Sequence, residues 1–401
     1  MTTTEQPHSH GVAPGEERAR KGQRTSPTAS RAEWFSSYDV EAFEVPSGRE
    51  EIWRFTPMKR LSGLHTGVEA TGQSTVDVAA APELTVETVA RQDKRLGTAG
   101  VPADRVAAQA YSSFESATVI TIGKEVRASA PSTVTITGPG EGKVAYGHLL
   151  VHAERFAEAV VVLDHRGAGT LADNVELVVD EGAKLTIVAV HDWADEAVHV
   201  SAHHAKVGRD ATLKHTVITL GGNVVRVSPT ATFADKGGNA ELLGLYFADA
   251  GQHFEHRTFV DHAVPNCKSD VTYKGALQGR ENEPAAHTVW IGDVLIRAAA
   301  EGTETFELNR NLILTDGARA DSVPNLEIET GEIVSAGHAS ATGRFDDEQL
   351  FYLQARGIPE DAARRLVVRG FFHEILLKIG VPDIRERLEA AIEAELEAVG
   401  I

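Results

Sequence analysis

The chain has 401 residues, 42% hydrophobic and 24% charged, a composition typical of a globular protein with a sizeable core. Lys and Arg total 39 against 58 Asp and Glu, and the net charge of −19 argues against nucleic acid or anionic lipid as the main partner. The single cysteine, Cys267, excludes an internal disulfide, and neither a spanning apolar run nor a secretory signal is present, so we expect a cytoplasmic protein.

The N-terminal part divides into a tail and a small mixed unit. Residues 1–32 are rich in Thr, Ser, Pro and Gly and are expected to be disordered, because they bury too little apolar surface to order the chain. Residues 33–116 are expected to form an N-terminal helical and mixed domain. Within it, the sequence predicts a short helix ended by Pro57 and a second helix from Pro102 to about Tyr111.

Residues 117–343 have the texture of β-structure. Short runs rich in β-branched residues are bounded by Gly, Asp and Asn, as strands between tight turns are. One turn-and-strand unit recurs at Gly182, Gly208 and Gly237, which are 26 and 29 residues apart. Such a spacing with little helix signal indicates a stacked β-solenoid, although a β-sandwich has similar short strands.

Residues 344–401 read as a helical C-terminal domain. The stretch from Asp346 to Gln349 predicts a capped helix start, and the next helix begins at Pro359. A last helix is expected from Asp383 to about Val399. In the middle helix an apolar stripe at steps of three and four residues is formed by Leu366, Val367, Gly370, Phe371, Ile375 and Ile379.

Two glycine-rich segments resemble nucleotide loops only superficially. Residues 167–172 fit the loose dinucleotide pattern, but a strand follows them where a helix N-terminus must hold the pyrophosphate, so a β-turn is favoured. Residues 137–144 lack the glycine spacing of a phosphate loop, and Val144 stands where Ser or Thr would bind magnesium. We expect no nucleotide site.

Histidines are numerous, 17 in all, and no metal-hydrolase template such as H-E-x-x-H occurs. Adjacent histidines on a strand point to opposite faces, so one strand alone does not chelate an ion. Hydrogen-bonded structural roles are favoured, and Cys267 is interpreted as a small buried hydrophobe rather than a nucleophile. The histidines that crowd the β core are His191, His199, His203, His204, His215, His253, His256 and His262.

His338 has a sharper case than the others. It lies among small residues where the β core gives way to the helices, and small neighbours expose an imidazole and let another chain approach closely. Taken alone, these residues still favour a structural histidine over a ligand.

Three ordered segments resemble a known family. The run from Ser322 to Ile358 resembles the C-terminal signature of the SufB/SufD family, the scaffold proteins of SUF iron–sulfur cluster assembly. Residues 52–57, Ile-Trp-Arg-Phe-Thr-Pro, resemble its N-terminal motif. Asp261-His262 with residues 269–275 resemble its mid-core motif, so the resemblance covers nearly everything after the tail.

The resemblance implies a mainly β fold, a right-handed parallel β-helix between helical end domains. It favours the SufD branch, because His338 is followed by Ala339 where SufB chains carry Glu, and because SufB chains are longer and richer in cysteine. It implies a heterodimer with SufB through the C-terminal coils. A homodimer is the expected alternative when the chain is alone.

The family's site then falls on His338, which would face a transient Fe–S cluster shared with SufB; the isolated chain would bind none tightly. Some relatives carry Cys at the position of Ala336, so here the thiolates must come from SufB. The ABC-type ATPase SufC would dock on the C-terminal helices. Candidate partner-binding residues are Leu350, Phe351, Tyr352, Arg356, Gly357, Ile358, Phe371 and Ile375.

The resulting expectation is a non-enzymatic scaffold that hydrolyses nothing itself. One alternative is a β-helix carbohydrate lyase or hydrolase, which the missing acid cluster and signal segment disfavour. A second is a mononuclear metal enzyme ligated by core histidines, and a third is a purely structural homodimer.

Overall fold

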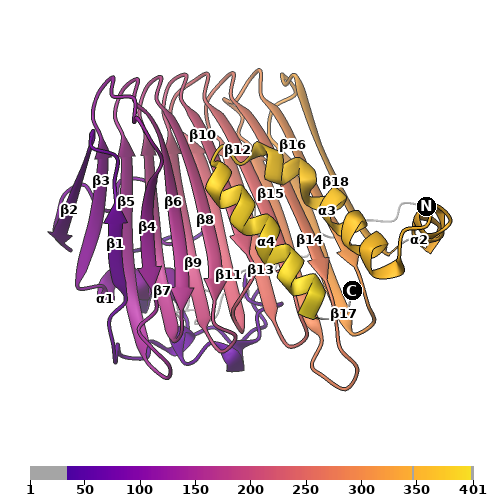
Figure 1. Ribbon diagram of the computed structural model, residues 1–401. Coiled ribbons are helices and arrows are strands. Elements are labelled where there is room, and N and C mark those ends of the chain that lie inside the picture. Colours follow the sequence, from indigo (N-terminus) through magenta and orange to yellow (C-terminus); the bar gives the residue numbers. More distant parts are fainter. Residues whose placement is uncertain (1–33, 346, 399–401) are drawn as a thin grey trace, which may run out of the picture.

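The computed structural model describes residues 34–345 and 347–398, and it is a parallel β-solenoid of about eight turns (Figure 1). The chain alternates between two nine-stranded sheets, A and B. The predicted tail, residues 1–32, and Asp346 at the predicted helix start lie outside the described residues. The handedness of the coils stays a prediction.

The strands follow each other through the sheets in an almost strictly alternating order. Sheet A contains, in spatial order, β1 Thr75–Ala79, β4 Ser132–Thr137, β6 Glu158–Gly167, β8 Lys184–Trp193, β10 Thr212–Thr219, β12 Asn239–Ala248, β14 Lys268–Leu277, β16 Glu304–Ile313 and β18 Ser335–Arg344. Sheet B contains β17 Ala318–Ile328, β15 Ala286–Ile296, β13 His253–His262, β11 Val224–Phe233, β9 Val198–Val207, β7 Thr170–Val179, β5 Val144–Ala153, β3 Ser116–Ile122 and β2 Leu84–Ala90. Among the strands of the described residues, only β1 and β2, at one end of the stack, pair antiparallel with their neighbours.

The repeated glycine unit is confirmed as the turn that begins successive strands of sheet A. Gly182, Gly208 and Gly237 lie in the turns before β8, β10 and β12, which are neighbours in that sheet. Gly182 and Gly237 have φ values of 66° and 78°, a left-handed conformation that glycine adopts without a Cβ clash. The glycine-rich residues 167–170 likewise form the tight turn between β6 and β7.

Strand alternation creates one core inside the solenoid and another outside it. On β8, Ile187 and Ala189 belong to the interior cluster, whereas Val188 and Val190 belong to the cluster under the C-terminal helices. Successive side chains of a strand point to opposite faces, and here both faces are covered. This explains why the middle strands are buried along almost their whole length.

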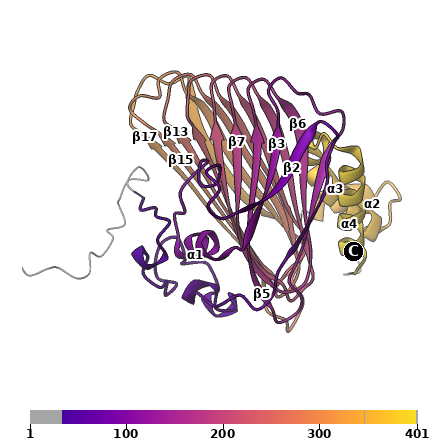
Figure 2. The ribbon, with the colours of Figure 1, turned by 90° about the vertical axis from the view of Figure 1, so that its left-hand side faces the viewer.

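The N-terminal segment covers the outer face of sheet B, where α1 Arg105–Ser113 lies against β5, β7 and β9 (Figure 2). The predicted second helix is thus confirmed, with Asp104 as its N-cap. The predicted helix before Pro57 is wrong: residues 50–56 form turns. Trp53 is buried there against the solenoid, and this tertiary contact overrides the local preference. Short 3-10 helices span Val40–Ala42, Met58–Arg60 and Leu64–Thr66.

The C-terminal helices are α2 Asp347–Gln354, α3 Glu360–Lys378 and α4 Pro382–Ala398, and α3 packs on β12 and β14 of sheet A. The predicted helices are confirmed, but the predicted apolar stripe of α3 is partly wrong. Leu366 is 48% exposed, and the buried face is formed by Ala363, Val368, Phe372, Ile375, Leu376 and Ile379. No helix within the described ranges has the length and hydropathy needed to cross a membrane.

Candidate functional site

His338 lies in β18, the last strand of sheet A, and its side chain is exposed. Its register partner on β16 is Glu307, which is fully buried. Two residues earlier, Ala336 packs against the interior cluster, so by alternation His338 also faces the solenoid interior. No further coil follows β18 within the described residues, and this interior position is therefore open to solvent at the end of the stack.

Glu307 is the chemically unusual neighbour of His338. Burial, with the nearby charge of Asp293, raises the pKa of Glu307 to about 8. Neither carboxylate oxygen has a hydrogen-bond partner within the described part of the chain. Adjacent strands are about 4.8 Å apart, so Glu307 and His338 are register neighbours on β16 and β18. The carboxyl of Glu307 changes its protonation state near neutral pH.

The interior near this end is polar rather than apolar. The Tyr246 hydroxyl donates to Asn311 over 2.7 Å and accepts from Asn309 over 2.9 Å, and the Asn311 amide donates to Ser322 over 3.0 Å. Asn311 also donates to Thr342 of β18 over 3.3 Å. A chain of hydrogen bonds, buried at Tyr246 and partly buried at Ser322 and Thr342, thus connects the interior of β12 with the strands of the last coil.

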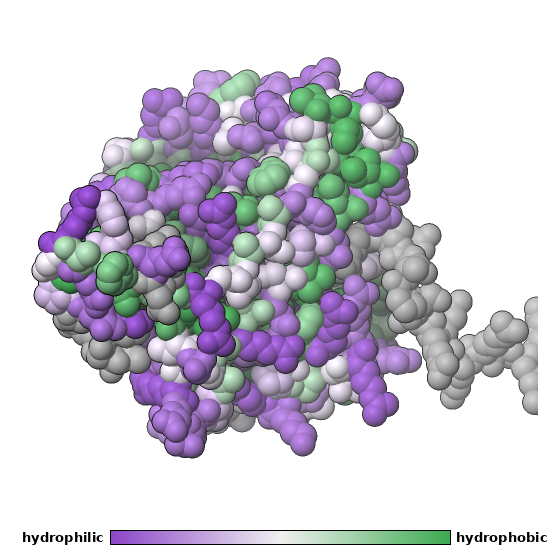
Figure 3. Space-filling view, turned by 90° about the vertical axis from the view of Figure 1, so that its right-hand side faces the viewer, coloured by the Kyte–Doolittle hydropathy of each residue, from purple (hydrophilic) through white to green (hydrophobic). Residues whose placement is uncertain are grey.

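Figure 3 views this end of the molecule and shows apolar surface scattered among polar surface. The large apolar side chains exposed on the last coil and β16 are Phe306, Ile328 and Val334, with 44%, 45% and 69% of their surface exposed. β18 itself is exposed at eight of ten positions, whereas β8 is exposed at two of ten.

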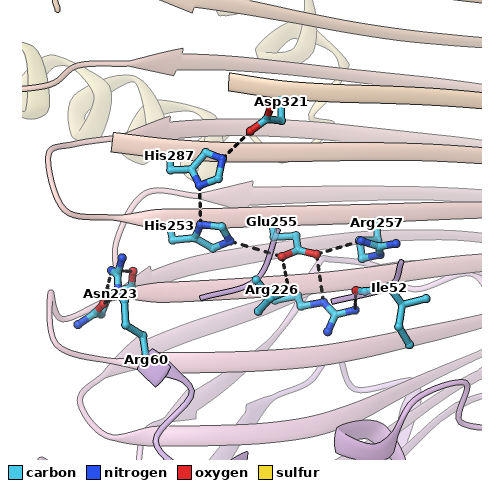
Figure 4. Close-up of polar contacts among 10 residues, drawn as sticks. Ile52, Arg60, Asn223, Arg226, His253, Glu255, Arg257, His287 and Asp321 are labelled. Atoms are coloured by element: carbon cyan, nitrogen blue, oxygen red, sulfur yellow. Dashed lines mark hydrogen bonds and ion pairs between the residues drawn. The ribbon is translucent and has the colours of Figure 1, made fainter. Parts of the chain in front are cut away.

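The N-terminal motif is brought against the middle of sheet B by a buried charge network (Figure 4). The guanidinium of Arg226 stacks on Trp53 at 3.6 Å from the ring centroid and donates to the carbonyl of Ile52 over 3.0 Å. Thr56 donates to the carboxylate of Glu255 over 2.7 Å.

Glu255 is the centre of that network. Burial alone would raise the pKa of Glu255, but the charges of Arg226 and Arg257 and a hydrogen bond from His253 hold it below its usual value. From His253 the network continues through His287, at 3.1 Å, to Asp321 of β17, at 2.7 Å. The first motif is therefore linked to the last strand of sheet B.

The mid-core motif connects the core to the C-terminal helices. His262 bonds Ser269 over 2.8 Å, and burial lowers the pKa of His262 to about 4. Lys274 donates to Glu374 over 2.7 Å and to the carbonyl of Phe371 over 3.2 Å, which fixes α3 on sheet A. These residues hold the fold together rather than lie beside His338.

The candidate partner-binding residues divide by exposure. Phe351 and Tyr352 are 72% and 56% exposed, and Arg356 stacks on Tyr352 at 4.5 Å. Leu350 and Ile375 are buried, so their side chains lie beneath the exposed residues of this set. The remaining members are exposed or half-buried: Gly357, Ile358 and Phe371.

Cys267 is fully buried, and burial raises the pKa of its thiol. It is a neutral core residue, as interpreted from the sequence. The eight core histidines are also buried. The sequence interpretation did not single out Glu307 or His165, because their importance depends on the register between strands of successive coils.

Comparison with known proteins agrees with this architecture. A family model described as "SUF system FeS cluster assembly, SufBD core domain" matches residues 134–371. An iron-sulfur cluster assembly SufBD family protein of Mycobacterium tuberculosis, Rv1462, is 66% identical over 371 residues, covering 92% of this chain and 94% of the relative.

Mycobacterium leprae has two such relatives. Its iron-sulfur cluster assembly SufBD family protein ML0594 is 63% identical over 365 residues, 90% of this chain and 93% of the relative. A second, ML0593, is 27% identical over 227 residues, 56% of this chain and 25% of the relative. The fold defines a two-sheeted β-solenoid protein. The chain belongs to the SufB/SufD family of SUF iron–sulfur cluster assembly proteins.

Proposed function

We propose that this chain is a SufD-type, non-enzymatic scaffold subunit, working in the cytoplasm, that pairs with a SufB-type chain through its last coil. The nascent Fe–S cluster is the cargo assembled at that interface and is shared with SufB rather than held tightly by this chain alone. The observation that carries the proposal is β18: ten residues, parallel to its neighbour and exposed, with one edge unpaired among the described strands.

An unpaired strand edge offers a row of backbone N–H and C=O groups to another strand. β18 has no charged side chain before Arg344 at its end, and the small residues along it let a second backbone approach closely. These small residues are Ser335, Ala336, Gly337, Ala339, Ser340, Ala341, Thr342 and Gly343.

The relatives support a partner that is a different member of the same family. Mycobacterium leprae carries both a protein 63% identical to this chain and a second one only 27% identical. Two diverged members of the same family in one organism fit a heterodimer. Self-pairing of this chain through the same edge is the alternative when the second is absent.

At such an interface His338 supplies a neutral imidazole nitrogen, a suitable iron ligand. Glu307 beside it can take up or release a proton near neutral pH as sulfide and thiol ligands exchange. Cys267 is buried and takes no part. The thiolates are therefore supplied by the partner.

We assign SufC docking to the surface around α2, where Phe351, Tyr352 and Arg356 are exposed. Aromatic and Arg side chains are enriched at the centres of protein interfaces. Gly357, with φ of 85°, ends α2 next to this surface. The backbone carbonyl of Phe371 on α3 accepts a hydrogen bond from Lys274 on β14. Through this contact, movement of a docked ATPase would be transmitted from the helices to the solenoid.

His338→Ala tests the cluster site. We expect the variant to fold, to co-purify with its SufB-type partner and to lose cluster assembly by more than tenfold, measured by Fe–S absorbance of the reconstituted complex. Ser340→Ala, on the same face of β18, is the matched control and should assemble clusters normally. Normal assembly in His338→Ala would remove His338 from the site.

Phe351→Asp tests the docking surface. Docking of SufC would remove the Phe351 side chain from water, and a charge at this position opposes that step. The variant should therefore reduce co-purification of SufC by tenfold or more without affecting co-purification of the SufB-type chain. Leu377→Asp changes another exposed apolar residue, on α3, and serves as the control. Equal loss in both variants would show that the docking surface is not specific to α2.

A further inference from the structure

Three histidines meet inside the solenoid, well away from His338. His165 of β6, His191 of β8 and His199 of β9 are fully buried, and one nitrogen from each lies within 4.8 Å of the others. The ring centroids are 4.5 Å apart for His165 and His191, 5.0 Å for His165 and His199, and 5.2 Å for His191 and His199. Strands β10, β12, β14 and β16 separate β8 from β18 in sheet A.

The hydrogen bonds around two of the rings fix which nitrogen carries the lone pair: on His165 it is free, and on His199 it accepts a hydrogen bond from Trp193 that a bound ion would replace. His165 Nδ1 is 3.2 Å from the carbonyl oxygen of Val190, which only accepts, so Nδ1 carries the proton and Nε2 has the lone pair. That Nε2 has no hydrogen-bond partner within the described residues.

His199 is oriented from two sides. Its Nε2 is 3.2 Å from the carboxylate of Asp173, and the indole N–H of Trp193 donates to its Nδ1 over 3.2 Å. The lone pair is therefore on Nδ1, which faces His191 Nδ1 at 3.2 Å. A carbonyl or carboxylate holding the outer nitrogen is the arrangement found around metal-bound imidazoles.

The charges of the cluster favour a cation. The carboxylate of Asp173 lies 3.2 Å from Nε2 of His199 and 4.0 Å from Nε2 of His165. An ionised carboxylate inside a core is costly without a compensating positive charge.

We propose that His165, His191 and His199 form a buried site for one divalent first-row transition-metal ion, with Asp173 orienting His199. Two imidazole nitrogens each about 2.1 Å from one ion lie roughly 3.4 Å apart at a tetrahedral angle, close to the 3.2 Å between the two Nδ1 atoms. The rings of His165 and His191 are stacked at 16°, so one of them turns about χ2 to close on the ion.

The ion would join three strands of both sheets, so its role is to stabilise the coils. A ligand that binds only the folded state raises stability, and the gain grows with the logarithm of ligand concentration over Kd. Neutral imidazoles suit zinc, iron and cobalt, and geometry rather than affinity separates them. The site is independent of the proposed pairing with SufB.

Since the cluster is enclosed, the ion must enter as the chain folds. The test is to unfold the full-length chain with a chelator present, remove the chelator, refold with Co²⁺, wash with EDTA and measure retained cobalt. We expect about one Co²⁺ per chain with a tetrahedral ligand-field spectrum. His165→Gln should retain less than a tenth of that amount.

His215→Gln is the matched control, because His215 is equally buried and bonds His203 but lies outside the cluster. It should retain cobalt as the wild type does, and cobalt should raise the urea midpoint of both proteins but not of His165→Gln. Chains isolated from zinc-supplemented cells give the same comparison without refolding. A folded wild type that retains neither metal, or equal retention in His165→Gln, would overturn the site.

Discussion

The strands at the two ends of the solenoid differ in length, direction and charge. At the N-terminal end the last strands, β1 and β2, are five and seven residues long, run antiparallel to their neighbours and carry Asp77 and Glu87. At the other end β18 is ten residues long, parallel and free of acidic residues. Short, charged and reversed edges resist pairing. We therefore propose that the end with β18, rather than the end with β1 and β2, pairs with another chain.

The two strands of the last coil also differ from each other. β17 carries Pro324, which has no N–H to donate to a further strand, and the charged residue Glu327 lies three positions further on. β18 has neither feature. We therefore assign partner pairing to sheet A, on the edge beside His338.

The largest effect is expected where the N-terminal segment covers the solenoid. Trp53→Ala removes a side chain that is 2% exposed and the stacking partner of Arg226. Loss of a buried Trp typically costs about 3–5 kcal/mol, measurable by urea unfolding. Phe35→Ala, at a 57% exposed aromatic, should cost far less. Similar losses in both variants would mean that the segment does not hold the covered middle of the stack.

A smaller effect is expected from placing a charged side chain on β18, the unpaired edge strand. Ala339→Arg places a long charged side chain on exposed β18 and should weaken pairing with the SufB-type chain about thirtyfold, or about 2 kcal/mol. Val86→Arg makes the same change on β2, at the other end, and should leave pairing unaffected. Calorimetric titration of both variants measures this. The contrast between the ends fails if Val86→Arg is the more damaging.

The smallest effect concerns the carboxyl beneath His338. Because the folded state raises the pKa of Glu307 to about 8, it binds a proton that the unfolded chain has released, and stability falls as pH rises from about 4.5 towards 8. Between about pH 6 and pH 7.5 the resulting decrease in the free energy of unfolding is at most about 2 kcal/mol.

Glu307→Gln should abolish that slope, and urea unfolding at the two pH values measures it. Glu301→Gln, at an exposed position of the loop before β16, is the control and should keep the wild-type slope. An unchanged slope in Glu307→Gln would show that Glu307 is ionised in the folded chain.

Much of the fold was predictable from local signals. The turn glycines at 182, 208 and 237 indicated the stack because each coil needs the same turn before its strand. The helices predicted to begin at Pro102 and Pro359 were readable for the same local reason; they begin at Arg105 and Glu360. The conformation around Trp53 was not, because it depends on Arg226, far away in the sequence.

The site was only partly predictable. His338 drew attention through its small neighbours, but its relation to Glu307 requires the register. Coil lengths vary: Thr212 pairs with Asn239, 27 residues on, and Lys268 with Glu304, 36 residues on. With such irregular spacing the inward neighbours of a residue cannot be counted off from the sequence, and the cluster of His165, His191 and His199 was missed for that reason.

The most direct test of the central claim is hydrogen–deuterium exchange of this chain, free and bound to its SufB-type partner. Backbone amides at an open edge exchange quickly and become protected when another strand pairs with them. We predict new protection concentrated in β18, around His338, with β1 and β2 unchanged. Protection at β1 and β2 without any change in β18 would contradict the account.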